Sequence, residues 1–180
     1  LPAARLTLLE DCEGPFTSKA FARVTLLCHV FLLFMFFHYR FCAAEGGLFK
    51  VIIARLSPPG RRVSDHKANC EPVASVFDAC QTVTMLFVCN FIGVACAKSL
   101  HFQFYVWYFH SLPLLLWCTR FPTVVKLALW LAIEAAWNPW AGETSSVASS
   151  VLLTASHAIL MAGLWDGLGP GKLGIFDRLE

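Results

Sequence analysis

Charged side chains are scarce in this 180-residue chain. Lys, Arg, Asp and Glu together make up 14% of the residues, whereas 57% are hydrophobic and 14% are aromatic. A soluble domain carries about 25% charged and about 45–50% apolar residues, so the composition excludes an ordinary soluble domain and a disordered chain. The formal net charge is only +2 and the basic residues are scattered, which argues against nucleic-acid binding. The mean hydropathy of +0.62 instead indicates a polytopic membrane protein.

The chain also lacks the short motifs of secreted and metal-binding proteins. None of its eight cysteines forms a CxxC pair, and no N-x-[ST] sequon is present. Cys28, Cys89, Cys96 and Cys118 lie inside apolar runs, where we expect them to be small apolar side chains of membrane helices. Leu1–Ala20 shows no signal-peptide pattern, and a first residue other than Met leads us to expect a fragment.

Five apolar runs predict an all-α, multi-pass transmembrane protein, because backbone groups in lipid must pair within their own helix. We expect a single membrane-embedded domain over residues 1–180. The predicted spans are 21–43, 78–97, 102–118, 124–137 and 147–165. The connection 45–72 is the most basic in the chain, so the positive-inside rule makes it a cytoplasmic loop. Counting crossings from there puts Lys98–His101 on the opposite, lumenal or external, side.

The stretch Lys98–His110, KSLHFQFYVWYFH, concentrates polar and aromatic side chains at that far-side mouth. On a helix, two polar stripes form: His101, Tyr105 and Tyr108 in one, and Gln103, Trp107 and His110 in the other. Polar groups at membrane depth are costly and tend to line a site, so the stripes predict a polar cavity. A cation and hydrogen-bond donors there suit a lipid phosphate. The alternative is an aromatic belt at the membrane interface with incidental polar groups.

Other polar residues within the predicted spans have simpler explanations. Asn90 and His157 are expected to tie helices together through hydrogen bonds, and His29 is expected to be a packing residue. Glu134 could be paired across helices or could face a cavity, and we favour the first. No spacing of possible ligands is convincing, so no metal site is predicted.

The stretch from Asn90 to Trp117, NFIGVACAKSLHFQFYVWYFHSLPLLLW, strongly resembles the dolichyl-phosphate-mannose-dependent α-1,3-mannosyltransferases of the endoplasmic reticulum. The family pattern is an N-F-I-G helix, a basic residue with S-L-H-[YF]-Q-F-Y-V-W-Y, and then H-[ST]-L-P. A fainter similarity follows at Glu134, Trp137–Asn138, His157 and Leu164–Trp165. The resemblance covers about Thr82 to Trp165, whereas Leu1–Pro15 does not read like the family.

The resemblance implies the C-terminal part of a GT-C-type glycosyltransferase, multi-pass in the endoplasmic-reticulum membrane. The donor would be dolichyl phosphate mannose and the acceptor the dolichyl-diphosphate oligosaccharide Man5GlcNAc2, with no cofactor. A mannose would be added in α-1,3 linkage in the lumen, with inversion, for protein N-glycosylation. Partners would be these two lipids and the surrounding membrane, without nucleic acid. The catalytic base is expected upstream of this fragment, which would then be inactive alone.

The resemblance also implies roles for the motif residues. Lys98 or His101 would contact the donor phosphate, while Gln103, Tyr105 and Tyr108 would bind sugar hydroxyls or hold the lumenal loop. Trp107 would stack on a sugar or anchor the interface, and His110 would hydrogen-bond within the cavity. Two other classes are open: a transporter or channel subunit, which would need paired Gly/Pro helix breaks and repeats, and a non-catalytic membrane assembly subunit.

Overall fold

The computed structural model describes residues 19–56, 79–98, 100, 102–138 and 147–169, and these ranges contain helices and turns without a β-strand. In chain order the elements are α2 (Lys19–Phe36), the π-helical turn η1 (Phe37–Phe41), α3 (Leu48–Leu56), α4 (Ala79–Ala95), α5 (Phe102–Tyr108), the 3₁₀ turn η3 (Phe109–Ser111), α6 (Leu112–Cys118), α7 (Thr123–Trp137) and α8 (Val147–Gly167). The predicted all-α class is therefore confirmed.

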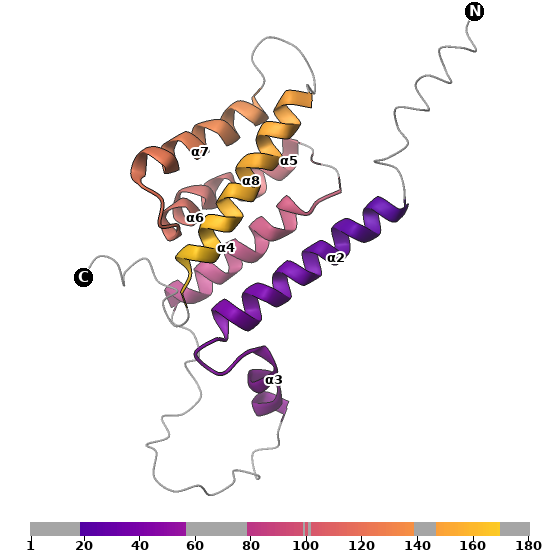
Figure 1. Ribbon diagram of the computed structural model, residues 1–180, viewed down its shortest axis with the longest axis vertical. Coiled ribbons are helices and arrows are strands. Elements are labelled where there is room, and N and C mark those ends of the chain that lie inside the picture. The colour runs from indigo at the N-terminus through magenta and orange to yellow at the C-terminus, as the bar shows by residue number, and fades with distance from the viewer. Residues whose placement is uncertain (1–18, 57–78, 99, 101, 139–146, 170–180) are drawn as a thin grey trace, which may run out of the picture.

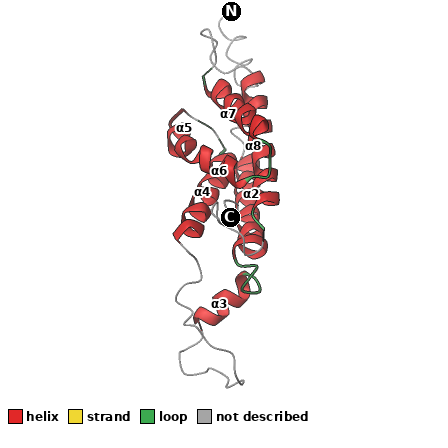
Figure 2. Ribbon diagram, turned by 90° about the vertical axis from the view of Figure 1, so that its left-hand side faces the viewer, coloured by secondary structure: helices red, strands yellow, loops and turns green. Residues whose placement is uncertain are grey.

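Helix α8 is the central element of the bundle. It packs against α7, α6 and α4, and α4 in turn packs against α2 (Figure 1). Figure 2 shows an elongated bundle, with α3 set apart at the end where α2 finishes. The core is apolar and includes the fully buried side chains of Phe91, Ile92, Leu115, Ile133 and Leu160.

The outward faces of the bundle are apolar as well. On α2, Val24, Leu27 and Phe31 are each more than half exposed, and on α7 Val124 is 77% exposed. Exposed apolar surface of this extent, continuous over a helix, is typical of a protein that meets lipid or another apolar partner. The outward faces, which carry charged side chains in a soluble bundle, therefore carry apolar side chains here.

Among the described residues, two helical segments are long and apolar enough to cross a membrane, Lys19–Phe41 and Ala148–Gly167. Ala79–Ala95 is an apolar helix of 17 residues, slightly shorter than the usual crossing length of about 20 residues. Helices also occupy the predicted spans 124–137 and 102–118. However, α7 has only 15 residues, and the helix over 102–118 is interrupted. The membrane character predicted from the composition is thus supported, and the number of five crossings stays a prediction.

The structure differs from the sequence reading at two places. The predicted span 102–118 is not one continuous helix, because Tyr108 leaves helical geometry (φ −129°, ψ −12°) and a 3₁₀ turn precedes α6. Pro113 explains the restart, since proline lacks a backbone donor and fits only the first turn of a helix.

The second difference is α3, which lies inside the predicted basic connection 45–72. Its sequence LFKVIIARL places apolar residues on one helical face, a period that the loop interpretation overlooked. Gly46 and Gly47 adopt φ values of +84° and +98°, and this left-handed backbone turns the chain from η1 into α3. The remainder of that connection, 57–72, falls outside the described residues.

Candidate functional site

A hydrogen-bonded cluster joins three helices at the centre of the bundle. Tyr108 of α5 is completely buried, and its hydroxyl oxygen accepts a hydrogen bond from the indole Nε1 of Trp137 on α7 at 2.9 Å. The same hydroxyl lies 2.8 Å from Nε2 of His157 on α8, whose side chain is 5% exposed. In an apolar bundle such contacts satisfy groups that would otherwise be costly to bury, so they fix how the three helices meet.

A second contact joins α5 to α7 one helical turn earlier. The Tyr105 hydroxyl donates a hydrogen bond to Oε1 of Glu134, and the Tyr105 ring lies 5.7 Å from the Trp137 ring. Asn138 closes the end of α7 by donating from Nδ2 to the Glu134 carbonyl oxygen at 3.1 Å. The cross-helix pairing favoured for Glu134 is confirmed, and so is the helix-tying hydrogen bond expected of His157.

Two side chains satisfy the carbonyl groups at the break between α5 and η3. Asn90 of α4 donates from Nδ2 to the Trp107 carbonyl oxygen at 3.0 Å. The Ser111 hydroxyl donates to the Tyr108 carbonyl oxygen at 2.7 Å. Because broken helices are tolerated at membrane depth only where neighbouring groups pair with the freed backbone, Asn90 and Ser111 make the break possible. The helix-tying role predicted for Asn90 is thereby confirmed.

The two predicted polar stripes differ in burial: the first faces the bundle and the second is exposed. In the first stripe, Tyr105 and Tyr108 point into the bundle, while His101 lies outside the described residues. In the second stripe, Gln103, Trp107 and His110 are exposed on the outer side of the same segment. The His110 ring meets the Phe87 ring edge-on at 5.6 Å. Lys98 is exposed just beyond the end of α4.

A cavity of about 550 Å³ lies between α2, α4 and α8. Its walls are mainly apolar and include Leu32 and Phe36 of α2 and Met161 and Trp165 of α8. His157 also lines it, so one side chain connects the cavity with the buried tyrosine cluster. The sequence reading missed this cavity. The available signal was the run of small residues at one-turn intervals on α8, Thr154, Ala158 and Ala162, which line it.

The packing of α2 against α4 confirms the role expected of His29. A Cβ atom placed on Gly93 of α4 would lie 3.8 Å from the His29 imidazole, so the ring rests on the glycine. Within the described ranges, no group of three His, Cys, Asp or Glu side chains comes together in a way that could hold a metal ion.

Apolar outer faces, two helices of membrane-crossing length and buried polar contacts between helices are typical of helical membrane proteins. The ALG3 protein family model matches residues 12–149, and the chain therefore belongs to the ALG3 protein family. This match extends the resemblance far upstream of Thr82 and includes the end of Leu1–Pro15.

Individual relatives carry consistent names. The chain is 42% identical over 157 residues to an Arabidopsis thaliana protein named Dol-P-Man:Man(5)GlcNAc(2)-PP-Dol alpha-1,3-mannosyltransferase, covering 85% of this chain and 34% of the relative. A Homo sapiens protein of the same name is 36% identical over 161 residues, covering 88% and 33%. A Drosophila melanogaster protein, named Dolichyl-P-Man:Man5GlcNAc2-PP-dolichol alpha-1,3-mannosyltransferase Alg3, is 47% identical over 109 residues, covering 58% and 21%.

The chain spans about a third or less of the length of these curated relatives. No solved structure matches it.

Proposed function

We propose that the complete gene product containing this chain transfers mannose from dolichyl phosphate mannose to the lipid-linked oligosaccharide Man5GlcNAc2-PP-dolichol, forming an α-1,3 linkage. Membership of the ALG3 family and the names of its relatives support this activity. A multi-pass GT-C-type enzyme of the endoplasmic-reticulum membrane, with a lumenal site serving protein N-glycosylation, fits the substrates in those names. This chain would be its C-terminal portion.

One structural observation carries the proposal further: the motif that identifies the family also builds the buried cluster. Tyr105 and Tyr108 contact Glu134, Trp137 and His157, which belong to the fainter part of the same resemblance. Of the two roles expected for these tyrosines, their burial and bonding favour holding α5 in place over binding sugar hydroxyls. The cluster would thus be the support of a site, and α5 the element supported.

The outer side of α5 and η3 then presents the groups that would meet substrate. Gln103, Trp107 and His110 are exposed there, and Lys98 lies shortly before α5 in the chain. Mannosyl transfer builds negative charge on the departing dolichyl phosphate, and a lysine or imidazolium near it would stabilise that charge. We assign this role to Lys98 or His101, and sugar contacts to Gln103, Trp107 and His110. The base that takes the acceptor proton would come from outside this chain.

The apolar cavity suits the hydrocarbon part of such substrates. Its walls of Leu32, Phe36, Met161 and Trp165 offer dispersion contacts and few hydrogen-bonding groups, which fit an isoprenoid chain and not a sugar. A transporter or channel is less well supported, because the carbonyl groups at the helix break are already bonded to Asn90 and Ser111 and are not offered to an ion.

Complementation tests the activity. The complete gene product is expressed in cells lacking the α-1,3-mannosyltransferase, and lipid-linked oligosaccharides are separated by chromatography. We expect the five-mannose intermediate to be converted to longer forms. If it still accumulates while the protein is present in the membrane, the proposed activity is wrong and a non-catalytic assembly role gains support.

Variants in the same cells test the residue roles. Replacing one group that stabilises transition-state charge typically lowers kcat by about 10²–10³-fold, and Lys98→Ala or His101→Ala should do so if it contacts the phosphate. Lys50→Ala is the matched control. Lys50 is also an exposed lysine, but it lies on α3, next to the C-terminal end of α2 and away from α5. Wild-type transfer by both Lys98→Ala and His101→Ala would remove the phosphate assignment.

A further inference from the structure

Within the described residues, the helix α3 exposes its apolar side. The exposed apolar side chains on it are those of Phe49, Ile52, Ile53 and Leu56. Their spacing of i, i+3, i+4 and i+7 puts them on one side of the helix. Lys50 and Ala54 are four positions apart, lie on the other side and are exposed too. The helix therefore separates an apolar side from a side that suits water.

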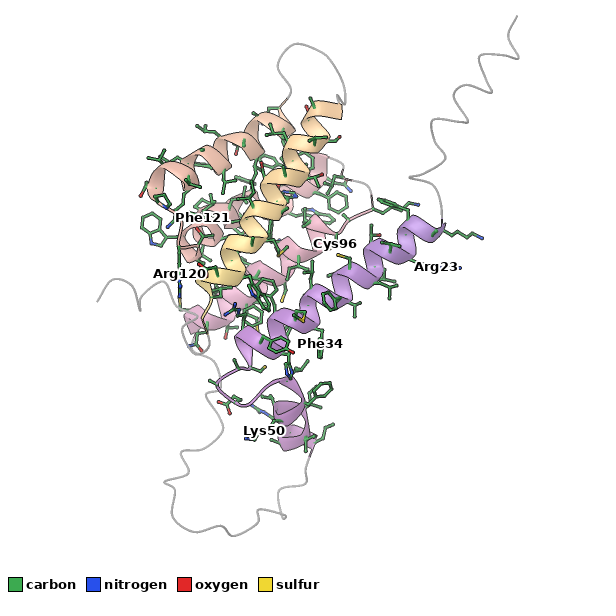
Figure 3. The ribbon with its side chains drawn as sticks, in the orientation of Figure 1. Arg23, Phe34, Lys50, Cys96, Arg120 and Phe121 are labelled. Carbon is green, nitrogen blue, oxygen red and sulfur yellow. The ribbon has the colours of Figure 1, made fainter. Side chains whose placement is uncertain are left out.

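Aromatic packing holds α3 against the end of α2. The Phe49 ring lies 5.8 Å from the Phe34 ring of α2 and 5.8 Å from the His38 ring of η1. A Cβ atom on Gly47 would lie 2.7 Å from the His38 ring, so only glycine lets the start of α3 come this close. Figure 3 labels Phe34 near the end of α2 that adjoins α3, and Lys50 on α3 itself.

The contact between Phe34 and Phe49 makes one continuous apolar surface out of two helices. On α2, Leu27, Phe31 and Phe34 follow one another at intervals of four and three residues, and all three are exposed. Phe49 extends this row onto the apolar side of α3. The medium that meets the outer face of α2 therefore also meets the apolar side of α3.

The length of the preceding helical segment sets the depth at which α3 begins. Lys19–Phe41 has 23 residues, or about 35 Å at 1.5 Å per residue, and the hydrocarbon layer is about 30 Å thick. If this segment crosses the membrane, it ends among the headgroups, and only the turn 42–47 separates it from α3. With nine residues, α3 is too short to cross.

We propose that α3 lies in the plane of the membrane surface, with its apolar side inserted between phospholipid acyl chains and its other side turned to water. The partner is the phospholipid bilayer in which α2 is embedded. A helix with one apolar and one polar side is most stable where an apolar and an aqueous phase meet. The helix has no acidic residue that anionic headgroups would repel.

Such an arm would fix the depth of α2 in the bilayer. The ring cluster couples α3 to α2, so a shift of α2 along the membrane normal would pull α3 out of the interface or push it into the hydrocarbon. The proposal uses the membrane crossing of α2 and is independent of the mannosyltransferase activity proposed above.

Photo-cross-linking identifies what contacts each side of α3. The photoreactive amino acid p-benzoylphenylalanine replaces Ile52 or, as the matched control, Ala54 in the complete gene product. These two positions point to nearly opposite sides, since each residue turns a helix by about 100°. The protein is reconstituted in phosphatidylcholine and phosphatidylserine bilayers, irradiated and digested, and the labelled peptides are analysed by mass spectrometry.

We expect phospholipid adducts at position 52 in several-fold higher yield than at position 54. A cross-link from position 52 to another peptide would overturn the proposal, because another part of the protein or a second copy would then cover the apolar side. Equal phospholipid adducts at both positions would also overturn it, since α3 would then be immersed in hydrocarbon.

Smaller substitutions provide a second measurement if the bulky amino acid disturbs folding. Ile52→Cys and Ala54→Cys are treated in the same bilayers with a membrane-impermeant maleimide, and labelling is followed for each peptide separately. Both positions are exposed in the structure, so the protein described here gives no reason for a difference. We expect labelling at position 52 to be several-fold slower than at position 54. Equal rates would refute insertion of the apolar side.

Discussion

The hydroxyl group of Tyr108 is the most informative single group to remove. Tyr108→Phe preserves the ring, which is fully buried, and deletes only the oxygen that accepts from Trp137 Nε1 and pairs with His157 Nε2. A buried hydrogen bond contributes about 0.5–1.5 kcal/mol net, so two of them give about 1–3 kcal/mol. Bonds between membrane helices average about 0.6 kcal/mol, which favours the lower half of that range.

The measurement is the free energy of unfolding of the complete protein in lipid bicelles, titrated with sodium dodecyl sulfate and followed by far-ultraviolet circular dichroism. Tyr39→Phe is the matched control, because Tyr39 is 50% exposed and loss of an exposed hydroxyl should change stability by less than about 0.5 kcal/mol. Equal effects of the two substitutions would refute the idea that the cluster holds the helices together.

A double-mutant cycle separates the energy of the Trp137–Tyr108 hydrogen bond from the cost of leaving one of its polar groups buried without a partner. Trp137→Phe removes the indole donor, and in the Tyr108→Phe/Trp137→Phe protein neither half of that bond is left unpaired. The double variant should therefore lose less stability than the two single variants together, with a coupling of about 0.5 kcal/mol or more. Strict additivity would mean that the two side chains do not share a bond in the membrane.

Three further outcomes can be measured in the same titration. Gly167→Ala places a Cβ atom against the backbone carbonyl oxygen of Cys118 and should cost about 1–3 kcal/mol. Gly93→Ala meets only the His29 ring at 3.8 Å and should be neutral or stabilising. Equal effects of the two substitutions would contradict the close backbone contact at Gly167. Glu134→Gln keeps an acceptor for its tyrosine partner and should retain more stability than Glu134→Ala, by about 1 kcal/mol. Arg120→Ala breaks an exposed ion pair with Asp166, at 3.9 Å, and should change stability by less than about 1 kcal/mol, so a larger loss would show that the pair is not solvent-screened.

Much of the architecture could be predicted from local pattern. The apolar runs identified where helices lie, because hydrocarbon length and backbone pairing constrain membrane segments strongly. The sequence reading also placed Tyr105 and Tyr108 on one helical face, and they do point to the same side. It could not show which face was buried, since both polar stripes of the motif contain aromatic and hydrogen-bonding residues.

What was missed depends on contacts far apart in the chain. The break after Tyr108 needs a donor to the Trp107 carbonyl oxygen from Asn90, which lies 17 residues before Trp107, and periodicity within one helix carries no such information. The helix α3 was obscured by its basic residues, which marked the segment as a cytoplasmic connection. The cavity arises only when α2, α4 and α8 are brought together, so no local signal specifies its volume.

The interrupted α5–α6 segment has a consequence for how the protein is made. Each half has seven residues, about 10 Å of helix, and neither can cross a bilayer alone. At the junction, the Trp107 carbonyl is satisfied by Asn90, which belongs to a helix synthesised earlier. If the segment crosses the membrane as the sequence predicts, we expect it to enter favourably only when α4 is already there to receive it. Substituting Asn90 would then impair insertion and yield during synthesis, before any effect on the finished protein could be measured.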